Sequence, residues 1–237
     1  MNGTELKIQL FADGANKQDI LELYKNPMIK GFTTNPTLMK KAGISDYKAF
    51  ALDILGEIKD RGISFEVFAD EFDDMKRQAL EIKSWADNVY VKIPVMNTKQ
   101  TFCGPLLSEL SEQGVKLNVT AIFTLEQVRD VVASLKGDTP AIISVFAGRI
   151  ADTGADPVPV MRAALELCKM RPNTELLWAS TRELFNVIEA DRIGCDIITA
   201  TPDILNKLKN LNKDLDAFSL ETVKMFYEDA TKAGFKI

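Results

Sequence analysis

Histidine is absent from this 237-residue sequence, and cysteine occurs only three times. Without histidine the chain can hold no Ser-His-Asp triad, no His-ligated metal and no His proton shuttle. The cysteines, Cys103, Cys168 and Cys195, are too far apart to resemble a metal-binding cluster. Their odd number, and an opening segment that is neither basic nor apolar, predict reduced thiols in a cytoplasmic protein without a metal site.

A positive charge balance and long apolar runs are also missing. The sequence has 29 basic and 34 acidic residues, which gives a net charge of −5. Nucleic-acid binding generally needs a basic surface, so no nucleic-acid partner is expected, although a local basic site for a small phosphate is compatible with this balance. No apolar run approaches the ~18–20 residues that a membrane-spanning helix requires, so no membrane partner is expected either.

What the chain does contain is a regular alternation of short apolar runs and longer amphipathic ones. Candidate strands are found at 7–12, 29–34, 63–68, 89–93, 115–120, 141–146, 175–179 and 196–200. Helical patterns include 47–59, 73–85, 125–135, 158–170, 182–191 and 220–231. No linker-like stretch interrupts the alternation, so we expect one domain over residues 1–237, with its C-terminal helix at about 218–233.

Several helix starts carry their own sequence signal. The pairs Thr124 with Gln127 and Ser180 with Glu183 have the spacing of a capping box. The Asp-Pro step at residues 156–157 places a capping residue before a proline, which is favoured at the first helical position. These signals predict helices that begin directly after Thr124 and Ser180, and at the proline of 156–157.

Eight strands alternating with helices indicate an α/β fold with parallel strands. From Asp13 to Ala200 the spacing averages about 27 residues per unit, which suits a (β/α)8 TIM barrel of ~250 residues. A doubly wound sheet alternates as well, but its central strands are apolar on both faces. It would also carry a glycine-rich phosphate loop after the first strand, and none is found there.

The strands of this chain are apolar at alternate positions only. One parity carries apolar side chains such as Phe65, Val91 and Leu177, and we expect it to pack beneath the helices. The other parity, which includes Trp178, should point inward. Its polar members gather toward the C-terminal ends of the strands and include Glu66, Lys92, Asn118, Thr120, Ser144 and Ser180. Inward residues at those ends line the mouth of a TIM barrel, so we expect a TIM barrel with an additional C-terminal helix.

Lys92 is the most informative of these residues, because it stands inside the apolar run Val-Tyr-Val-Lys-Ile-Pro at 89–94. A charged lysine is expensive to bury there, so the amine should give up its proton and act as a nucleophile. The structural alternatives are a lysine that snorkels at a strand end or one that pairs with a buried carboxylate.

Two carboxylates are expected to face the same mouth as Lys92. Asp13 ends the first strand and Glu66 the third, and two carboxylates beside an amine form an acid/base set that needs neither histidine nor metal. Asp13 could instead serve the turn that follows it. The acidic residues at 70–74 leave open a carboxylate metal site, although capping the next helix explains them as well.

Polar groups after other strands suggest how a substrate is held. Thr33 and Asn35 share a parity in a segment too polar for a strand end, and could bind hydroxyls. Arg149 follows the sixth strand, and Ser180 and Arg182 follow the seventh. Ser180 would ordinarily cap a helix and Arg182 lie on its surface, yet barrels often bind phosphate near the last strands and at a helix N-terminus.

Taken together, these motifs resemble the transaldolase family. The resemblance runs from Asp13 to about residue 205 and rests on separate motifs in the family's order. The motifs are Gly-Phe-Thr-Thr-Asn-Pro-Thr-Leu at 31–38, Val-Lys-Ile-Pro at 91–94, Leu-Asn-Val-Thr at 117–120, Ile-Ser-Val-Phe-Ala-Gly-Arg-Ile at 143–150 and Ala-Ser-Thr-Arg at 179–182.

The resemblance implies a role for each residue. Lys92 would form an imine with a ketose carbonyl, Asp13 would take the proton from the hydroxyl whose carbon becomes an aldehyde, and Glu66 with Thr120 would manage protons through a water. The residues implied in substrate binding are Thr33, Asn35, Asn118, Ser144, Phe146, Arg149, Ser180 and Arg182. Sugar phosphates, as in the pentose phosphate pathway, are the implied substrates, no cofactor is needed, and a homo-oligomer is expected.

Three other functions remain open at the level of sequence. Short relatives that are fructose-6-phosphate aldolases usually carry Gln and Tyr where this chain has Glu66 and Phe146, which favours transaldolase over aldolase. A non-catalytic sugar-phosphate-binding barrel would have no use for an amine at Lys92. A barrel isomerase would favour carboxylate or cysteine bases over an imine.

Overall fold

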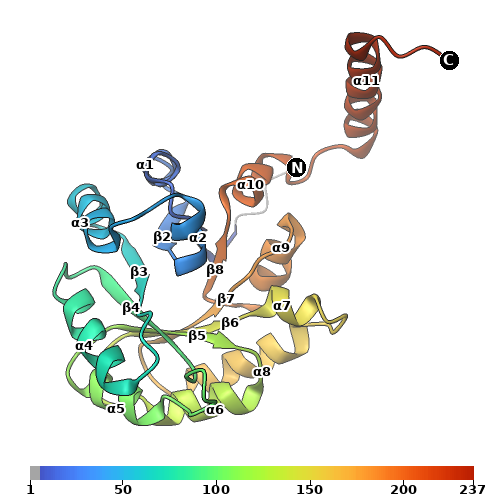
Figure 1. The fold of residues 1–237 in the computed structure, drawn as a ribbon. Coiled ribbons are helices and arrows are strands. Elements are labelled where there is room, and N and C mark those ends of the chain that lie inside the picture. The colour runs from blue at the N-terminus through green and yellow to red at the C-terminus, as the bar shows by residue number, and fades with distance from the viewer. Residues whose placement is uncertain (1–5) are drawn as a thin grey trace.

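Eight parallel strands close into a barrel in residues 6–237, the part of the chain that the computed structural model describes (Figure 1). The strands are β1 (Gln9–Asp13), β2 (Ile29–Thr33), β3 (Gly62–Glu66), β4 (Val89–Pro94), β5 (Leu117–Ile122), β6 (Ala141–Val145), β7 (Thr174–Trp178) and β8 (Ile197–Ala200). Each strand pairs with the next, and β8 pairs with β1. The predicted TIM barrel is confirmed.

Helices follow the strands, and those before α11 surround the barrel. They are α1 (Lys17–Tyr24), α2 (Pro36–Lys41), α3 (Tyr47–Glu57), α4 (Phe72–Lys83), α5 (Gly104–Glu112), α6 (Leu125–Ser134), α7 (Ala147–Ala151), α8 (Val158–Lys169), α9 (Leu184–Ile193), α10 (Pro202–Leu205), the 3₁₀ helix η1 (Asn206–Asn210) and α11 (Leu215–Ala233). None of these helices is both long and apolar enough to cross a membrane.

One of the predicted helix starts is wrong. The capping box of Thr124 and Gln127 is present at the start of α6, as predicted. The box before α9, however, is formed by Glu183 and Asn186, and this helix begins at Leu184. Ser180 cannot cap it, because its φ of 60° turns the chain into the left-handed region before the helix starts. The helix α8 begins at Val158, where the helical pattern at 158–170 begins, and the proline of 156–157 is its N-cap rather than its first residue.

The barrel wall separates two apolar regions. The larger lies between the strands and the helices and includes Phe65, Val91 and Trp178, each fully buried. The smaller fills the barrel interior, where Phe11 packs with Ile142, Leu177, Ala179 and Ile197. Glycine at position 31 makes room for Phe11, because a Cβ there would lie 2.5 Å from its ring.

The inward and outward assignment of the strands is confirmed except on β7. There Leu177 faces the interior and Trp178 packs beneath the helices, the reverse of the prediction. The register explains this, because Leu177 pairs with the inward Ser144 and Trp178 with the outward Val145. Both parities of β7 are apolar, so hydrophobicity alone could not distinguish its faces.

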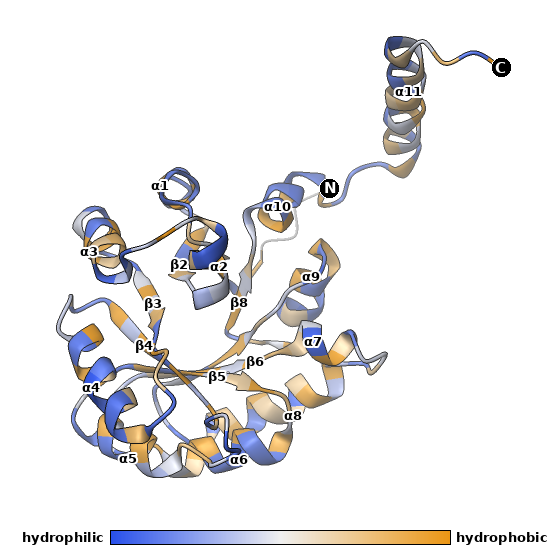
Figure 2. Cartoon of the chain, viewed as in Figure 1, coloured by the Kyte–Doolittle hydropathy of each residue, from blue (hydrophilic) through white to orange (hydrophobic). Residues whose placement is uncertain are grey.

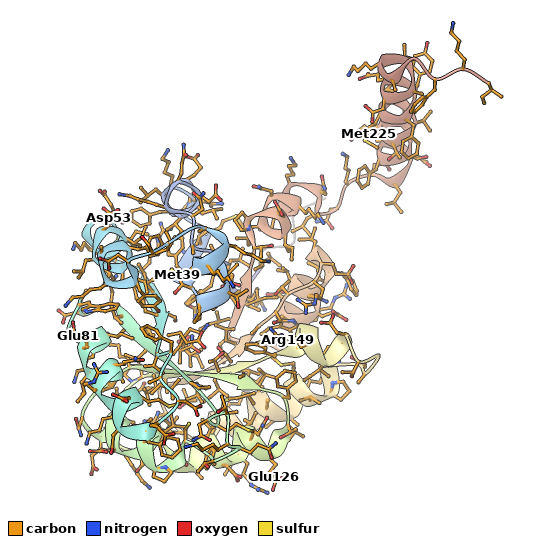
Figure 3. All side chains as sticks on the ribbon, viewed as in Figure 1. Met39, Asp53, Glu81, Glu126, Arg149 and Met225 are labelled. Carbon is orange, nitrogen blue, oxygen red and sulfur yellow. The ribbon has the colours of Figure 1, made fainter. Side chains whose placement is uncertain are left out.

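The C-terminal helix α11 extends away from the barrel (Figure 1). Hydrophobic residues occur along its whole length (Figure 2), and none of its residues is buried. Figure 3 shows Met225 on this helix, well apart from the side chains of the barrel. The most exposed large apolar side chains of α11 are Leu215, Leu220, Val223, Phe226 and Tyr227.

Candidate active site

Lys92 and Glu66 form a buried ion pair at the C-terminal end of the barrel. They are direct neighbours in the β3–β4 register, so their side chains project inward side by side. The Nζ of Lys92 lies 3.1 Å from Oε2 of Glu66 and donates a hydrogen bond of 2.8 Å to the Thr34 carbonyl. Lys92 is only 7% exposed. The amine is therefore buried beside one of the two predicted carboxylates, whose side chain is 18% exposed.

Asp13 ends β1 on the same interior face. Burial raises the pKa of its carboxyl group above the usual range, the Lys92 charge and a hydrogen bond from Thr33 oppose this rise, and Glu66 adds to it. The charges of both Lys92 and Glu66 therefore change the pKa of Asp13, so the three groups interact electrostatically. The predicted acid/base set of Asp13, Glu66 and Lys92 is thus assembled in one place.

Thr33 supports Asp13 through a chain of hydroxyl groups. Its Oγ1 donates to Oδ1 of Asp13 at 2.7 Å and lies 2.6 Å from Oγ1 of Thr199 on β8. Because the single Thr33 proton points to Asp13, Thr199 is the donor in the second bond. The hydroxyl predicted to bind substrate is therefore engaged in holding Asp13. Sequence reasoning missed Thr199, although it lies at a strand end on the inward parity.

A second polar network crosses the interior beside Lys92. Ser144 Oγ donates to Oδ1 of Asn118 at 2.7 Å, and Nδ2 of Asn118 donates to Ser64 Oγ at 3.0 Å. All three residues are buried. Since the Ser144 proton is committed to Asn118, its oxygen can accept a hydrogen bond from a substrate hydroxyl.

Thr120 and Asn35 retain polar groups that could serve a substrate or water. Oγ1 of Thr120 is buried and has no hydrogen-bond partner among residues 6–237. An unpaired buried hydroxyl is costly, and a bound water or substrate would satisfy it. Asn35 caps α2 with its Oδ1, which accepts from Leu38 N at 3.0 Å. Its Nδ2 group is then the part of Asn35 that could donate to a sugar hydroxyl.

The predicted phosphate ligands lie on neighbouring segments after β6 and β7. Arg149 is exposed on α7 at the edge of the barrel (Figure 3), with its guanidinium carbon 5.3 Å from the centroid of the Phe146 ring. Arg182 binds a carboxylate, because its Nε donates to Asp152 at 2.9 Å and its Nη2 also contacts that carboxylate. The Arg182 bond, with the charges of both arginines, lowers the pKa of Asp152.

Other features surround this mouth. A cleft of about 280 Å³ opens beside Asp13, between α1, α2 and the start of α10. The acidic residues at 70–74 do not converge: Asp70 accepts from Thr98 and Glu71 pairs with Lys99. Within residues 6–237, no three His, Cys, Asp or Glu side chains are grouped so that they could hold a metal ion.

Residues 10–237 match the family model described as Transaldolase/Fructose-6-phosphate aldolase. The chain belongs to this family. A probable transaldolase of Dehalococcoides mccartyi is 33% identical over 202 residues, covering 85% of this chain and 90% of that protein. A probable transaldolase of Erythrobacter litoralis is 34% identical over 215 residues, with 89% and 94% covered. One of Novosphingobium aromaticivorans is 34% identical over 232 residues, with 97% and 100% covered.

Within this transaldolase/aldolase barrel, the predicted residues form an inner and an outer group. The inner group surrounds the Lys92 amine, which Glu66 contacts and with which Asp13 interacts electrostatically. The outer group holds Arg149, Ser180 and Arg182 on the segments that follow β6 and β7.

Proposed function

We propose that this chain is a transaldolase that transfers a dihydroxyacetone unit from fructose 6-phosphate or sedoheptulose 7-phosphate to an aldose phosphate through a Schiff base on Lys92. The observation that carries the proposal is the buried Lys92 amine, held 3.1 Å from the Glu66 carboxylate and 2.8 Å from the Thr34 carbonyl. Membership of the family and relatives named probable transaldolase support it.

The first half of the reaction joins the ketose to the enzyme. Lys92 first passes its proton to Glu66 within the ion pair, and the neutral amine then attacks the ketose carbonyl and forms a carbinolamine. Glu66, with the unpaired Thr120 hydroxyl holding a water, supplies the proton with which the carbinolamine oxygen leaves as water. The product is an iminium on Lys92, which accepts electrons from the neighbouring carbon–carbon bond.

The second half moves the three-carbon unit. Asp13 takes the proton from the hydroxyl two carbons from the iminium, the carbon–carbon bond breaks, and its electrons form an enamine on Lys92 while an aldehyde phosphate leaves. The enamine then attacks the aldehyde of the acceptor, whose oxygen regains the proton from Asp13. Water hydrolyses the new iminium and releases the product ketose phosphate.

The remaining residues orient the substrate. Nδ2 of Asn35 and the oxygen of Ser144 would bind the hydroxyls of the dihydroxyacetone unit. Arg149 and Arg182 would bind the phosphate with Ser180, and the phosphate would share Arg182 with Asp152. Guanidinium groups suit this role because they can donate two hydrogen bonds to one phosphate.

Fructose-6-phosphate aldolase is the second candidate, since the matched family covers both activities. Aldolase activity requires the enamine carbon to be protonated. Phe146 offers no proton, and its ring packs against Phe123 with 5.7 Å between centroids. Incubation with fructose 6-phosphate and erythrose 4-phosphate should give sedoheptulose 7-phosphate much faster than fructose 6-phosphate alone releases dihydroxyacetone. Equal rates with and without acceptor would assign the aldolase instead.

We also propose that the chain forms a homo-oligomer through α11. This helix exposes Val223, Phe226 and Tyr227, which its own barrel leaves uncovered. A second copy would bury these side chains. Light scattering should give a mass above one chain for the wild type, and Phe226→Asp should reduce it. A wild-type monomer would contradict this assignment.

A further inference from the structure

The β2–β3 hydrogen-bond ladder changes partners next to Lys92. Thr33 is in register with Ser64, and Thr34 N donates to the Ser64 carbonyl at 3.2 Å. In a regular parallel ladder, the next bond would run from Glu66 N to the Thr34 carbonyl. Instead, the Thr34 carbonyl accepts from Lys92 Nζ.

A tyrosine from outside the barrel takes the place of that missing bond. Glu66 N donates to the Tyr47 hydroxyl at 2.7 Å, and the same hydroxyl donates to the Glu66 carbonyl at 2.9 Å. One hydroxyl can do both because it offers one proton and two lone pairs. Tyr47 is the first residue of α3, and no spacing in the sequence links it to the strand ends.

The Tyr47 ring is fixed where this contact requires it. It packs edge-on against Phe65 and Phe68, with 6.3 and 5.6 Å between centroids, and lies 6.1 Å from the Trp85 ring. Burial raises the pKa of the Tyr47 hydroxyl well above that of a free tyrosine. The group therefore stays neutral across the working pH range and keeps the proton that it donates to Glu66.

We propose that Tyr47 is a positioning residue for the Lys92 chemistry. Its hydroxyl replaces the ladder partner of Glu66, which frees the Thr34 carbonyl to hold Lys92 and fixes the backbone from which the Glu66 carboxylate reaches the same amine. Without that hydroxyl, the unpaired Glu66 N–H competes with Lys92 for the Thr34 carbonyl, because a buried N–H requires an acceptor. This inference rests on the proposed role of Lys92 in imine formation.

Tyr47→Phe tests the proposal because it keeps the ring and removes only the oxygen. We expect kcat to fall about tenfold or more with the KM for fructose 6-phosphate nearly unchanged, as for a group that orients the reaction rather than binds substrate. Borohydride trapping of the imine at Lys92 should slow in parallel.

Tyr24→Phe is the matched control. The Tyr24 hydroxyl also donates one bond, at 2.6 Å to Asp60, but on the surface at the end of α1. This variant should keep the wild-type kcat and trapping rate. A Tyr47→Phe enzyme with a lower melting temperature but wild-type kcat and trapping, measured well below that temperature, would show that Tyr47 is only structural.

A crystal structure of Tyr47→Phe gives a readout that does not depend on activity. Glu66 N should now donate to the Thr34 carbonyl, and Lys92 Nζ should leave hydrogen-bond distance of it. If Lys92 keeps both of its partners in that structure, the proposal is wrong, whatever the wild type does with substrate. Failure of the wild type to form any imine would instead refute the proposed transaldolase reaction.

Discussion

Gly148 packs directly against the carbonyl of Ser180, so closely that a Cβ on Gly148 would lie 1.6 Å from that oxygen. Gly148 N also donates to the Ala179 carbonyl at 3.2 Å. This contact joins the start of α7 to the end of β7. It holds together the segments that carry Arg149 and Arg182, where Arg182 binds Asp152 and the charge of Arg149 also acts on that carboxylate.

Gly148→Ala should therefore separate these two segments. The methyl group must displace backbone rather than a flexible side chain, so we expect a loss of at least ~2 kcal/mol of stability and a higher KM for phosphorylated donors. Gly56→Ala in α3 is the control, because a Cβ there meets nothing within 4 Å. Thermal unfolding and initial rates test this, and a Gly148→Ala protein with wild-type values would show that the two segments can separate without cost.

Arg149→Ala and Arg182→Ala should mainly weaken the use of phosphorylated donors. Each lost charge-assisted contact is expected to cost ~1.5–3 kcal/mol, or roughly 10- to 150-fold in kcat/KM. Transfer of unphosphorylated dihydroxyacetone should suffer much less. Arg192→Ala is the matched control, since Arg192 also stands over an aromatic ring, that of Phe185, at 5.6 Å. Equal losses for both substrate types would make the two arginines structural.

The raised pKa of Asp13 predicts how activity depends on pH. As the base, Asp13 must be ionised, so kcat/KM should fall on the acid side at a pH above that of an ordinary aspartate. Thr33→Val removes a hydrogen bond that lowers this pKa and should move the fall to still higher pH. An acid limb that Thr33→Val leaves unmoved would mean that another group controls it.

The stability effect of Asp13 has a defined sign. A carboxyl group whose pKa is higher in the folded chain binds its proton more weakly after unfolding, so ionisation favours the unfolded state. Its cost is absent below the unfolded value near 3.8 and complete above the folded pKa. Asp13→Asn should thus raise the melting temperature at neutral pH, with a smaller gain toward pH 4. An equal gain at both pH values would contradict this.

The barrel could be predicted from the sequence because its signals are periodic. Apolar and polar residues alternate on most strands, so strand faces and the positions of Glu66 and Lys92 follow directly. On β7, where Leu177 and Trp178 are both apolar, the same reasoning failed. Hydrophobic periodicity also could not predict contacts between segments that are distant in the sequence. Asp152, directly after α7, binds Arg182, and Tyr47 at the start of α3 binds Glu66. The sequence spacing of these residues predicts neither contact.

Phe146→Tyr should shift the enzyme from transfer toward hydrolysis. Phe146 packs against the interior cluster, so we expect a hydroxyl on its ring to face the barrel mouth and protonate the enamine. Release of dihydroxyacetone from fructose 6-phosphate without acceptor should rise about tenfold or more, because a positioned proton donor speeds protonation of the enamine. Phe123→Tyr is the control, because Phe123 is 37% exposed and lies outside the interior cluster. No change in Phe146→Tyr would show that its ring lies away from the enamine.

The residue to which the substrate becomes attached tests the Schiff-base mechanism most directly. After incubation with fructose 6-phosphate and borohydride, mass spectrometry should find a reduced three- or six-carbon unit on Lys92. Lys92→Ala should lose both the label and turnover, while Lys48→Ala, which removes a surface lysine paired with Glu81, should keep both. A label on any other lysine, or full turnover in Lys92→Ala, would contradict imine formation on Lys92.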